Sequence, residues 1–319
     1  MRIVSFIALG AWLAASAFAQ PYPAKPIRMI VTTAPGGLMD VPARIATDYL
    51  DKSLGQRVLM ENRGGAGGNI GTDMVAKAPP DGYTIGFVQL GNFALNPFVF
   101  KDFPYDPLTD LVPIAPMTSS AILVVVNKNV PATNLTEFIA LAKKKPKGIN
   151  HGSAGLGTVP HLASELFSQR AGIELTHVHY RGAGPAVNDL VAGQVDVVFV
   201  GLGAVRAHLA SGALRVLAVA QPARLRGAPE FPTSAEAGLP GFEFTTWFGF
   251  AAPKGTPAEV VSLLAKHIHT MQDDPALAPR LAAGGMEILK ESPEQFRQRI
   301  RADYETFREV VRKAGLKPE

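Results

Sequence analysis

The stretch IRMIVTTAPGGLMDVPARIATDYL, residues 27–50, contains the unit that repeats along this chain. Residues 27–31 form a mostly aliphatic run that predicts a strand, a Gly-Gly turn follows, and residues 42–50 have the apolar spacing of a helix. Further runs rich in aliphatic and β-branched residues predict strands at residues 58–60, 84–88, 123–126, 174–178, 195–200 and 216–220. Because helical segments lie between most of these strands, the sequence predicts an α/β fold with mainly parallel sheets.

Three later helices have clear start signals. Asn134 precedes a helix predicted over residues 135–144, and Thr256-Pro257 precedes one over residues 258–271. Ser292-Pro293 opens the last long helix, which we expect to end near Gly315.

The N-terminus has the organisation of a secretory signal peptide. One basic residue precedes an apolar run over residues 3–15, and an A-x-A cleavage motif ends at Ala19. A membrane anchor would need about 20 mostly apolar residues, and the prolines at positions 21 and 23 break a continuing helix. We therefore expect residues 1–19 to be removed, the mature chain to begin at Gln20, and the protein to be exported to the periplasm.

Composition narrows the class of protein. The chain has 319 residues, no cysteine and a formal net charge of +4. Without cysteine, neither a disulfide framework nor a thiolate metal site can form, and we expect no lipid anchor. The longest run of like charge is residues 143–145, too small a basic cluster for a nucleic-acid partner. The length is sufficient for two domains.

Several longer motifs occur in the order in which a known family has them. They are ENRGGAGGNIG followed by APPDGYT within residues 61–84, HVHYRGAGPAVNDLVAGQVDVVF over residues 177–199, and SAEAGLPGFE before TWFG within residues 234–249. Over residues 22–316 the sequence closely resembles the Bug family of periplasmic solute-binding proteins, the receptors of tripartite tricarboxylate transporters.

The resemblance implies an α/β fold of the two-lobe type-II periplasmic binding protein kind, a Venus flytrap with a hinge of two crossing strands. Lobe 1 would contain residues 20–120 and 246–319, and lobe 2 residues 121–245. The crossings would lie near residues 118–124 and 244–250, which include Trp247. We expect this tryptophan to pin the hinge.

The implied function is capture of a small organic carboxylate in the cleft between the lobes and its delivery to the membrane permease subunits of a transporter. We expect a monomer without cofactor, metal or catalysis. Two alternatives remain open, a ligand-sensing receptor for a signalling partner and a periplasmic serine hydrolase using Ser153. The hydrolase motif G-x-S-x-G is incomplete because His151 occupies its first glycine position, and Pro160 stands where a dinucleotide fingerprint needs its third glycine.

The first candidate site is the turn Gly36-Gly37-Leu38-Met39. Ligands of open α/β sheets bind beyond the carboxyl ends of the strands, and glycines let a ligand approach the backbone. The helix that follows would direct its free N–H groups at an anion. We expect these four residues to contact the ligand, and Asp40 to be the structural N-cap of the helix.

A second glycine-rich loop contains Ser153, Gly155, Gly157 and Thr158. Thr158 is expected to cap a helix, so that loop amides and the two hydroxyls could bind an anion. A solvent-exposed turn is the alternative interpretation.

Other candidates follow predicted strands. These ligand-binding candidates are Gln89, Gly91 and Asn92 after the strand at 84–88, Arg181, Gly182 and Ala183 before a helix, and Gly201 and Leu202 after the strand at 195–200. Arg181 could clamp a carboxylate with two donors or be structural, because receptors resembling this chain hold the carboxylate largely through backbone amides and water.

His177 and His179 alternate along a predicted strand and so share a face, from which two imidazoles could reach one metal ion. Members of the family commonly have proline where this chain has His179. Solvated or hydrogen-bonded histidines are the interpretation that we prefer, so we expect no metal site.

Two departures from the family pattern bear on the ligand. Leu38 and Met39 stand where relatives often have small polar residues, and Gly201-Leu202 stands where they often have Asp-Asn. Both changes remove polar groups from expected pocket walls. We therefore expect a mono- or dicarboxylate with an apolar body to bind more tightly than citrate.

Overall fold

The structure is a computed structural model that describes residues 22–33, 35, 39–155, 158–180, 182–315 and 318. The predicted signal peptide, residues 1–19, and the expected mature start at Gln20 lie outside these residues. None of the described helices is both long and apolar enough to cross a membrane.

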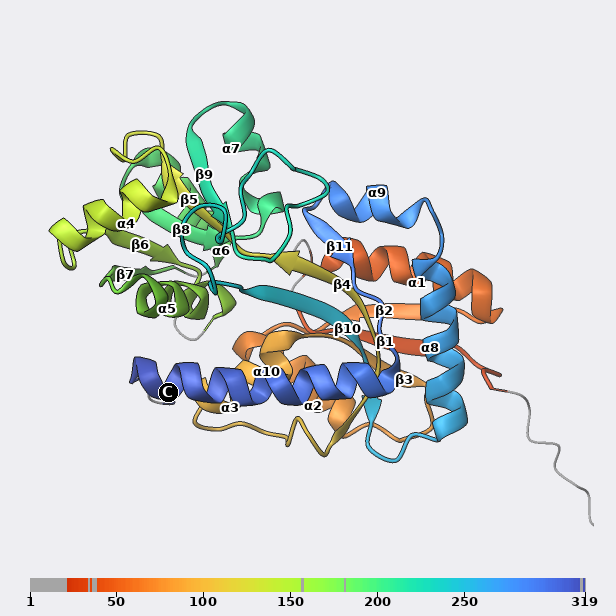
Figure 1. Cartoon of the computed structure of the whole chain (residues 1–319). Coiled ribbons are helices and arrows are strands. Elements are labelled where there is room, and N and C mark those ends of the chain that lie inside the picture. Colours follow the sequence, from red (N-terminus) through yellow and green to blue (C-terminus); the bar gives the residue numbers. More distant parts are fainter. Residues whose placement is uncertain are drawn as a thin grey trace, which may run out of the picture.

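The described strands form two sheets, one in each lobe of the molecule (Figure 1). The sheet of lobe 1 has the strand order β11 (Met286–Ile288), β4 (Leu111–Ala121), β10 (Thr245–Pro253), β3 (Thr84–Gln89), β1 (Ile27–Val31), β2 (Val58–Asn62). The sheet of lobe 2 has the order β7 (Thr176–His179), β6 (Asn150–Ser153), β8 (Val197–Val200), β5 (Leu123–Asn127), β9 (Leu214–Val219).

Helices pack against both sheets. In lobe 1 they are α1 (Asp40–Leu54), α2 (Asn69–Ala76), α3 (Asn96–Val99), α8 (Ala258–Gln272), α9 (Leu277–Ala282) and α10 (Pro293–Ala314), with a 3-10 turn at Ala66–Gly68 and a π-helical turn at Gly91–Leu95. In lobe 2 they are α4 (Leu135–Lys144), α5 (Val159–Ala171), α6 (Ala183–Ala192) and α7 (Arg206–Ala210), with a 3-10 turn at Leu202–Ala204.

The chain passes between the lobes along two strands that lie side by side. β4 continues into β5 with only Ile122 between them, and β10 returns from lobe 2 antiparallel to β4, so that Thr246 pairs with Ser120. The expectation of mainly parallel sheets is therefore wrong. β1, β2 and β3 are parallel, but an outgoing and a returning crossing must run in opposite directions, and β5 is antiparallel to both of its neighbours.

The apolar core is divided among three clusters of buried side chains. One fills lobe 1 between its sheet, α1 and α8, and another fills lobe 2 around α6. The third includes Phe93 and Phe296 of lobe 1 together with Phe167 and Phe199 of lobe 2, and so joins the lobes. The helix α10 runs beside this shared cluster from lobe 1 to α5 of lobe 2 (Figure 1).

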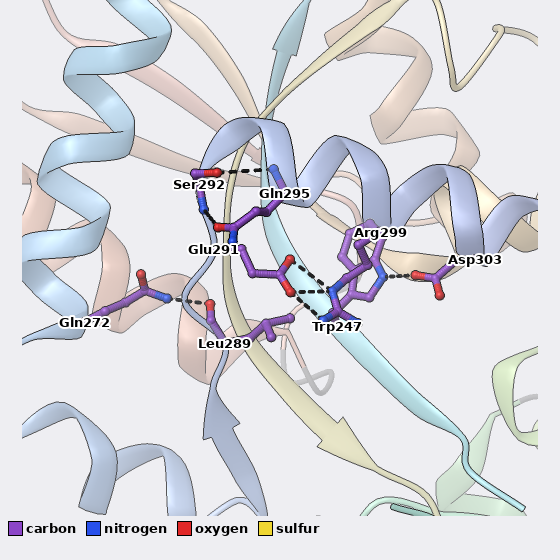
Figure 2. Close-up of polar contacts among 8 residues, drawn as sticks. All are labelled: Trp247, Gln272, Leu289, Glu291, Ser292, Gln295, Arg299 and Asp303. Atoms are coloured by element: carbon purple, nitrogen blue, oxygen red, sulfur yellow. Dashed lines mark hydrogen bonds and ion pairs between the residues drawn. The ribbon is translucent and has the colours of Figure 1, made fainter. Parts of the chain in front are cut away.

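Figure 2 shows how α10 is held against the crossing strands. Its start is fixed by a capping box, in which Ser292 Oγ accepts from Gln295 N and Gln295 Oε1 accepts from Ser292 N. Further along, Trp247 of β10 donates from Nε1 to Asp303 Oδ2 at 2.8 Å, and Arg299 forms a two-pronged ion pair with Glu291.

Helix ends follow the sequence signals where a side chain forms the predicted cap. Asn134 Oδ1 accepts from Glu137 N at 2.9 Å at the start of α4, and Ser292 caps α10, which ends before Gly315 as expected. The expected cap at Thr256 is wrong. Pro257 is the N-cap of α8, and the Thr256 hydroxyl instead donates to the Pro253 carbonyl.

Candidate ligand-binding cleft

A cleft of about 780 Å³ lies between the lobes, within the usual size of small-molecule sites. Lobe 1 contributes Val41, Gln89, Phe248, Arg280, Leu281, Ala283, Gly284 and Met286, lobe 2 contributes Val159, Pro160, Ala183, Gly184, Val200, Gly201, Gly203 and Ala204, and the crossings contribute Ile122 and Thr246. Most of these side chains are apolar, so the walls favour a ligand with a hydrocarbon body.

Three helices begin at this cleft. Val41, Val159 with Pro160, and Ala183 with Gly184 lie in the first turns of α1, α5 and α6. First-turn N–H groups, which the prolines at positions 42, 160 and 185 lack, have no partner within their own helix, and the positive end of the helix dipole favours an anion. The cleft therefore offers backbone donors from both lobes to a negatively charged group.

The crossing strand β10 contains a residue that lines the cleft and has a buried hydroxyl without a partner. The side chains of Thr246 and Phe248 line it, whereas Trp247 between them points to α10. Thr246 Oγ1 and the Oγ of its pairing partner Ser120 are buried without a hydrogen-bond partner in the described part of the chain. A buried hydroxyl without a partner costs about 1–3 kcal/mol, so a polar ligand group that reached Thr246 Oγ1 would recover part of this cost.

The sequence predictions missed the wall formed by α9 and β11. Arg280 is exposed and lines the cleft, and it has no ion-pair partner among the described residues. Met286 follows a Gly-Gly turn in which Gly285 has a positive φ of 74° and approaches Leu202 so closely that a Cβ would lie 2.5 Å from that side chain. The Gly-Gly pair at 284–285 was the available signal for a close approach, but nothing in the sequence indicated the lobe that it would meet.

The first glycine loop is only partly described. Gly36, Gly37 and Leu38 lie outside the described residues, and Met39 does not line the cleft. Its side chain is fully buried in the core of lobe 1, where its sulfur contacts Thr32 Oγ1 at 3.9 Å. The expectation that Met39 forms an apolar pocket wall is thus wrong. Val41, two residues later, is 59% exposed and lines the cleft instead.

Asp40 does not cap α1. The helix begins at Asp40 itself and Met39 holds the N-cap position, so the expected cap is displaced by one residue. The carboxylate pairs with Arg44 at 3.0 Å, one turn along α1, and accepts from Asn62 Nδ2 at 3.5 Å. A carboxylate in the first turn interacts favourably with the helix dipole. Asp40 therefore still has a structural role, but not as the N-cap.

The glycine motif at residues 61–71 packs against the end of β1. A Cβ on Gly68, whose φ is 94°, would lie 2.8 Å from the Thr32 carbonyl oxygen, and one on Gly71 would lie 2.5 Å from the Arg63 carbonyl oxygen. Only glycine allows this packing against the end of β1.

Of the three candidates that follow β3, one lines the cleft and two do not. Gln89 lines the cleft, but Gly91 and Asn92 are buried and do not line it. Asn92 is internally satisfied, because its Oδ1 accepts from Thr32 Oγ1 at 3.1 Å and its Nδ2 donates to the Gly67 carbonyl at 3.1 Å. These contacts tie the glycine motif to β1, so the placement of Gly91 and Asn92 at the ligand is wrong.

The hydroxyls of Ser153 and Thr158 in the second loop form hydrogen bonds with the loop's own backbone. Ser153 Oγ is buried, donates to the Gly155 carbonyl at 3.0 Å and accepts from Gly155 N at 3.2 Å. Thr158 is the N-cap of α5, as expected, but its hydroxyl donates to the same carbonyl at 2.7 Å. Gly157 lies outside the described residues. Ser153 has no histidine partner among the described residues, which opposes the hydrolase alternative.

Around α6 and β8, Ala183 and Gly201 line the cleft, Gly182 is the N-cap of α6, and Arg181 lies outside the described residues. Leu202 is 1% exposed, belongs to the core of lobe 2 and does not line the cleft. Its expected role as a pocket wall is wrong, because the 3-10 turn directs Leu202 toward Gly285.

Comparison with known proteins identifies the fold that forms this cleft. The family described as tripartite tricarboxylate transporter family receptor matches residues 42–316. The chain belongs to this family. Protein BugT of Bordetella pertussis is 37% identical over 318 residues, which cover 99% of this receptor and 98% of BugT.

Two solved structures resemble the receptor over most of its length. An R. palustris protein with adipate is 33% identical with a TM-score of 0.85, and the match covers 93% of the receptor and 100% of that chain. MatC from Rhodopseudomonas palustris with bound malate is 31% identical with a TM-score of 0.79, over 91% and 100% of the two chains. The predicted two-lobe fold and family are confirmed, and the protein is a solute-binding receptor and not an enzyme.

Proposed function

We propose that this receptor works in the periplasm, where it captures a small organic carboxylate with an apolar body and delivers it to the membrane permease subunits of a tripartite tricarboxylate transporter. The observation that carries the proposal is the convergence of the first turns of α1, α5 and α6 on one mostly apolar cleft. Backbone donors fix the carboxylate, and the apolar side chains bury the remainder of the molecule at about 25 cal/mol per Å².

The ligand is a mono- or dicarboxylate. Among the described residues, Gln89, Thr246 and Arg280 are the polar side chains that line the cleft, a set too small for a densely hydroxylated or tricarboxylic acid. Arg280 stands at the lobe 1 wall and suits a second carboxylate. Relatives solved with adipate and malate are consistent with this class.

The mature receptor acts as a monomer that begins at Gln20, with residues 20–120 and 246–319 in lobe 1 and 121–245 in lobe 2. A ligand that contacts both lobes favours the closed state, with bending at the β4–β10 crossing. The gain from ligand at 100 times its Kd is about 2.7 kcal/mol of folding stability.

The test is calorimetry on the mature protein after a thermal-shift screen of carboxylates. The best acid should bind more tightly than citrate, and its neutral amide should bind at least about tenfold more weakly, a loss of about 1.4 kcal/mol. Equal binding of acid and amide would overturn the anion site. Tighter binding of citrate would overturn the assignment of the walls.

Small-angle scattering with the same acid tests the clamp. The radius of gyration should decrease on binding, and an unchanged radius would contradict closure. Intact mass of the secreted protein should correspond to a chain starting at Gln20, and a retained N-terminus would contradict cleavage after Ala19.

A further inference from the structure

Lobe 2 contains a cluster of imidazoles and one carboxylate that the carboxylate-binding cleft does not use. His161 and Glu165 lie one turn apart on the same face of α5, and His177 projects toward them from β7. Their ligand atoms all lie within 4.8 Å of one another. Three residues from two rigid elements thus converge on one point.

The distances suit a single metal ion. His177 Nε2 lies 2.9 Å and His161 Nε2 lies 3.6 Å from the same oxygen, Glu165 Oε1. A tetrahedral ion with bonds of about 2.0–2.1 Å holds its ligand atoms roughly 3.4 Å apart. The two observed distances bracket this separation, so small side-chain rotations would complete the coordination.

The ligand chemistry is equally specific. Two imidazoles and one carboxylate form a set that binds zinc with a fourth position open to water. Nitrogen ligands also select against Mg²⁺ and Ca²⁺, which prefer oxygen.

A neighbouring strand supplies an outer partner. His151 on β6 is the register partner of His177 on β7, and their Nδ1 atoms lie 2.9 Å apart. With Nε2 of His177 on the metal, its Nδ1–H can donate to His151, a contact that orients metal-bound histidines.

The cluster is accessible from solvent. β7 is the edge strand of its sheet, and the side chains of His177 and Glu165 are 20% and 18% exposed, whereas that of His161 is 2% exposed. An ion can therefore enter from the sheet edge and meet a mostly buried inner ligand. The ring of His179 lies 5.1 Å from that of His161, on the face that the sequence assigned to both strand histidines.

We propose that His161, Glu165 and His177 form a binding site for a divalent transition-metal ion, with Zn²⁺ as the best match. The site ties α5 to the edge strand. Since Val159 and Pro160 in the first turn of α5 line the cleft, a bound ion fixes the helix that forms one of its walls. This proposal replaces the expectation of no metal site, which considered only the histidine pair on the strand.

Calorimetry with ZnCl₂ on the mature protein without a histidine tag tests the site. We expect one Zn²⁺ per chain, reversal by EDTA, and no binding of Mg²⁺ under the same conditions. His177→Gln and the isosteric Glu165→Gln should each weaken binding at least about tenfold. His208→Gln, on α7 of the same lobe, is the matched control and should bind as wild type does.

Absence of saturable one-to-one binding, or wild-type affinity in both ligand variants, would overturn the proposal. Circular dichroism checks that the variants fold. Should either variant fail to fold, the absorption spectrum of the Co²⁺-substituted wild-type protein decides the question, because visible bands of a tetrahedral site support it and their absence overturns it. Binding of a carboxylate is measured separately, so this result and that of the proposed function are independent.

Discussion

The two faces of β10 have different roles at the neighbouring residues Thr246 and Trp247. Trp247 is 1% exposed, packs against Phe93 and Phe296 with ring centroids 5.8 and 4.8 Å away, and has its N–H satisfied by Asp303. Thr246, beside it, lines the cleft, and its buried hydroxyl has no partner in the described part of the chain. The Trp247 face has its N–H group hydrogen-bonded and stabilises the fold. The Thr246 face lines the cleft and has a hydroxyl that no described residue binds.

This difference between the two faces follows from the alternation of side chains along a strand. Strand alternation lets one crossing serve as both hinge anchor and cleft floor, because side chains at successive positions never share a face. Substitutions on the α10 face should change stability and leave ligand affinity intact, and substitutions on the cleft face should do the reverse.

The largest effect is expected for Trp247→Ala. Removing a buried tryptophan costs about 3–5 kcal/mol, and here it also leaves Asp303 without its N–H donor. Urea unfolding should show this loss. Thr246→Val is the comparison variant and should not lose stability, because the hydroxyl that it removes is buried without a hydrogen-bond partner among the described residues. Comparable losses in the free energy of unfolding for the two variants would contradict the proposed difference between the faces.

Asp303→Asn should give a pH-dependent gain. Burial raises the pKa of Asp303 from 3.8 to about 6, only partly offset by Trp247 and Arg299. The folded state thus holds the proton more tightly than the unfolded state, so this contribution to stability is full below pH 3.8 and lost as the pH rises through about 6.

The variant should equal wild type near pH 4 and be more stable at pH 8, by on the order of 3 kcal/mol at most. Unfolding curves of both proteins across this range provide the measurement. A variant that is less stable at every pH would instead show that the ionised carboxylate strengthens its contact with Trp247.

Thr246→Val tests whether the cleft face of β10 contacts the ligand. Loss of one ligand hydrogen bond costs about 0.5–1.5 kcal/mol, or roughly fivefold in Kd, for the acid found in the screen. Calorimetry measures the affinity and thermal unfolding measures the apo protein, whose stability should be unchanged or slightly higher. Unchanged affinity would mean that Thr246 does not contact the ligand.

Arg280→Gln should have the smallest effect and a selective one. An exposed ion pair contributes about 0–1 kcal/mol, so a dicarboxylate should lose two- to fivefold in affinity while a monocarboxylate of the same length loses none. Arg297→Gln on α10, which pairs with Glu294 outside the cleft, is the control. Equal losses for both acids would remove Arg280 from the recognition of a second carboxylate.

The sequence by itself determined the features set by local patterns. Aliphatic runs placed β1, β3 and β5 almost to the residue, side-chain caps placed α4 and α10, and the ordered motifs gave the family and its two-lobe fold. These signals depend on neighbours within a few positions, and they are therefore legible before folding.

Only the tertiary structure decided which residues face the cleft. Met39 and Leu202 looked like pocket walls but pack into the two cores, while Val41 and Arg280 take their places. His161 and Glu165 met His177 only because α5 packs on the sheet whose edge strand carries His177. Which side of a helix or turn meets the other lobe depends on contacts between segments distant along the chain, and spacing in the sequence does not encode that rotation.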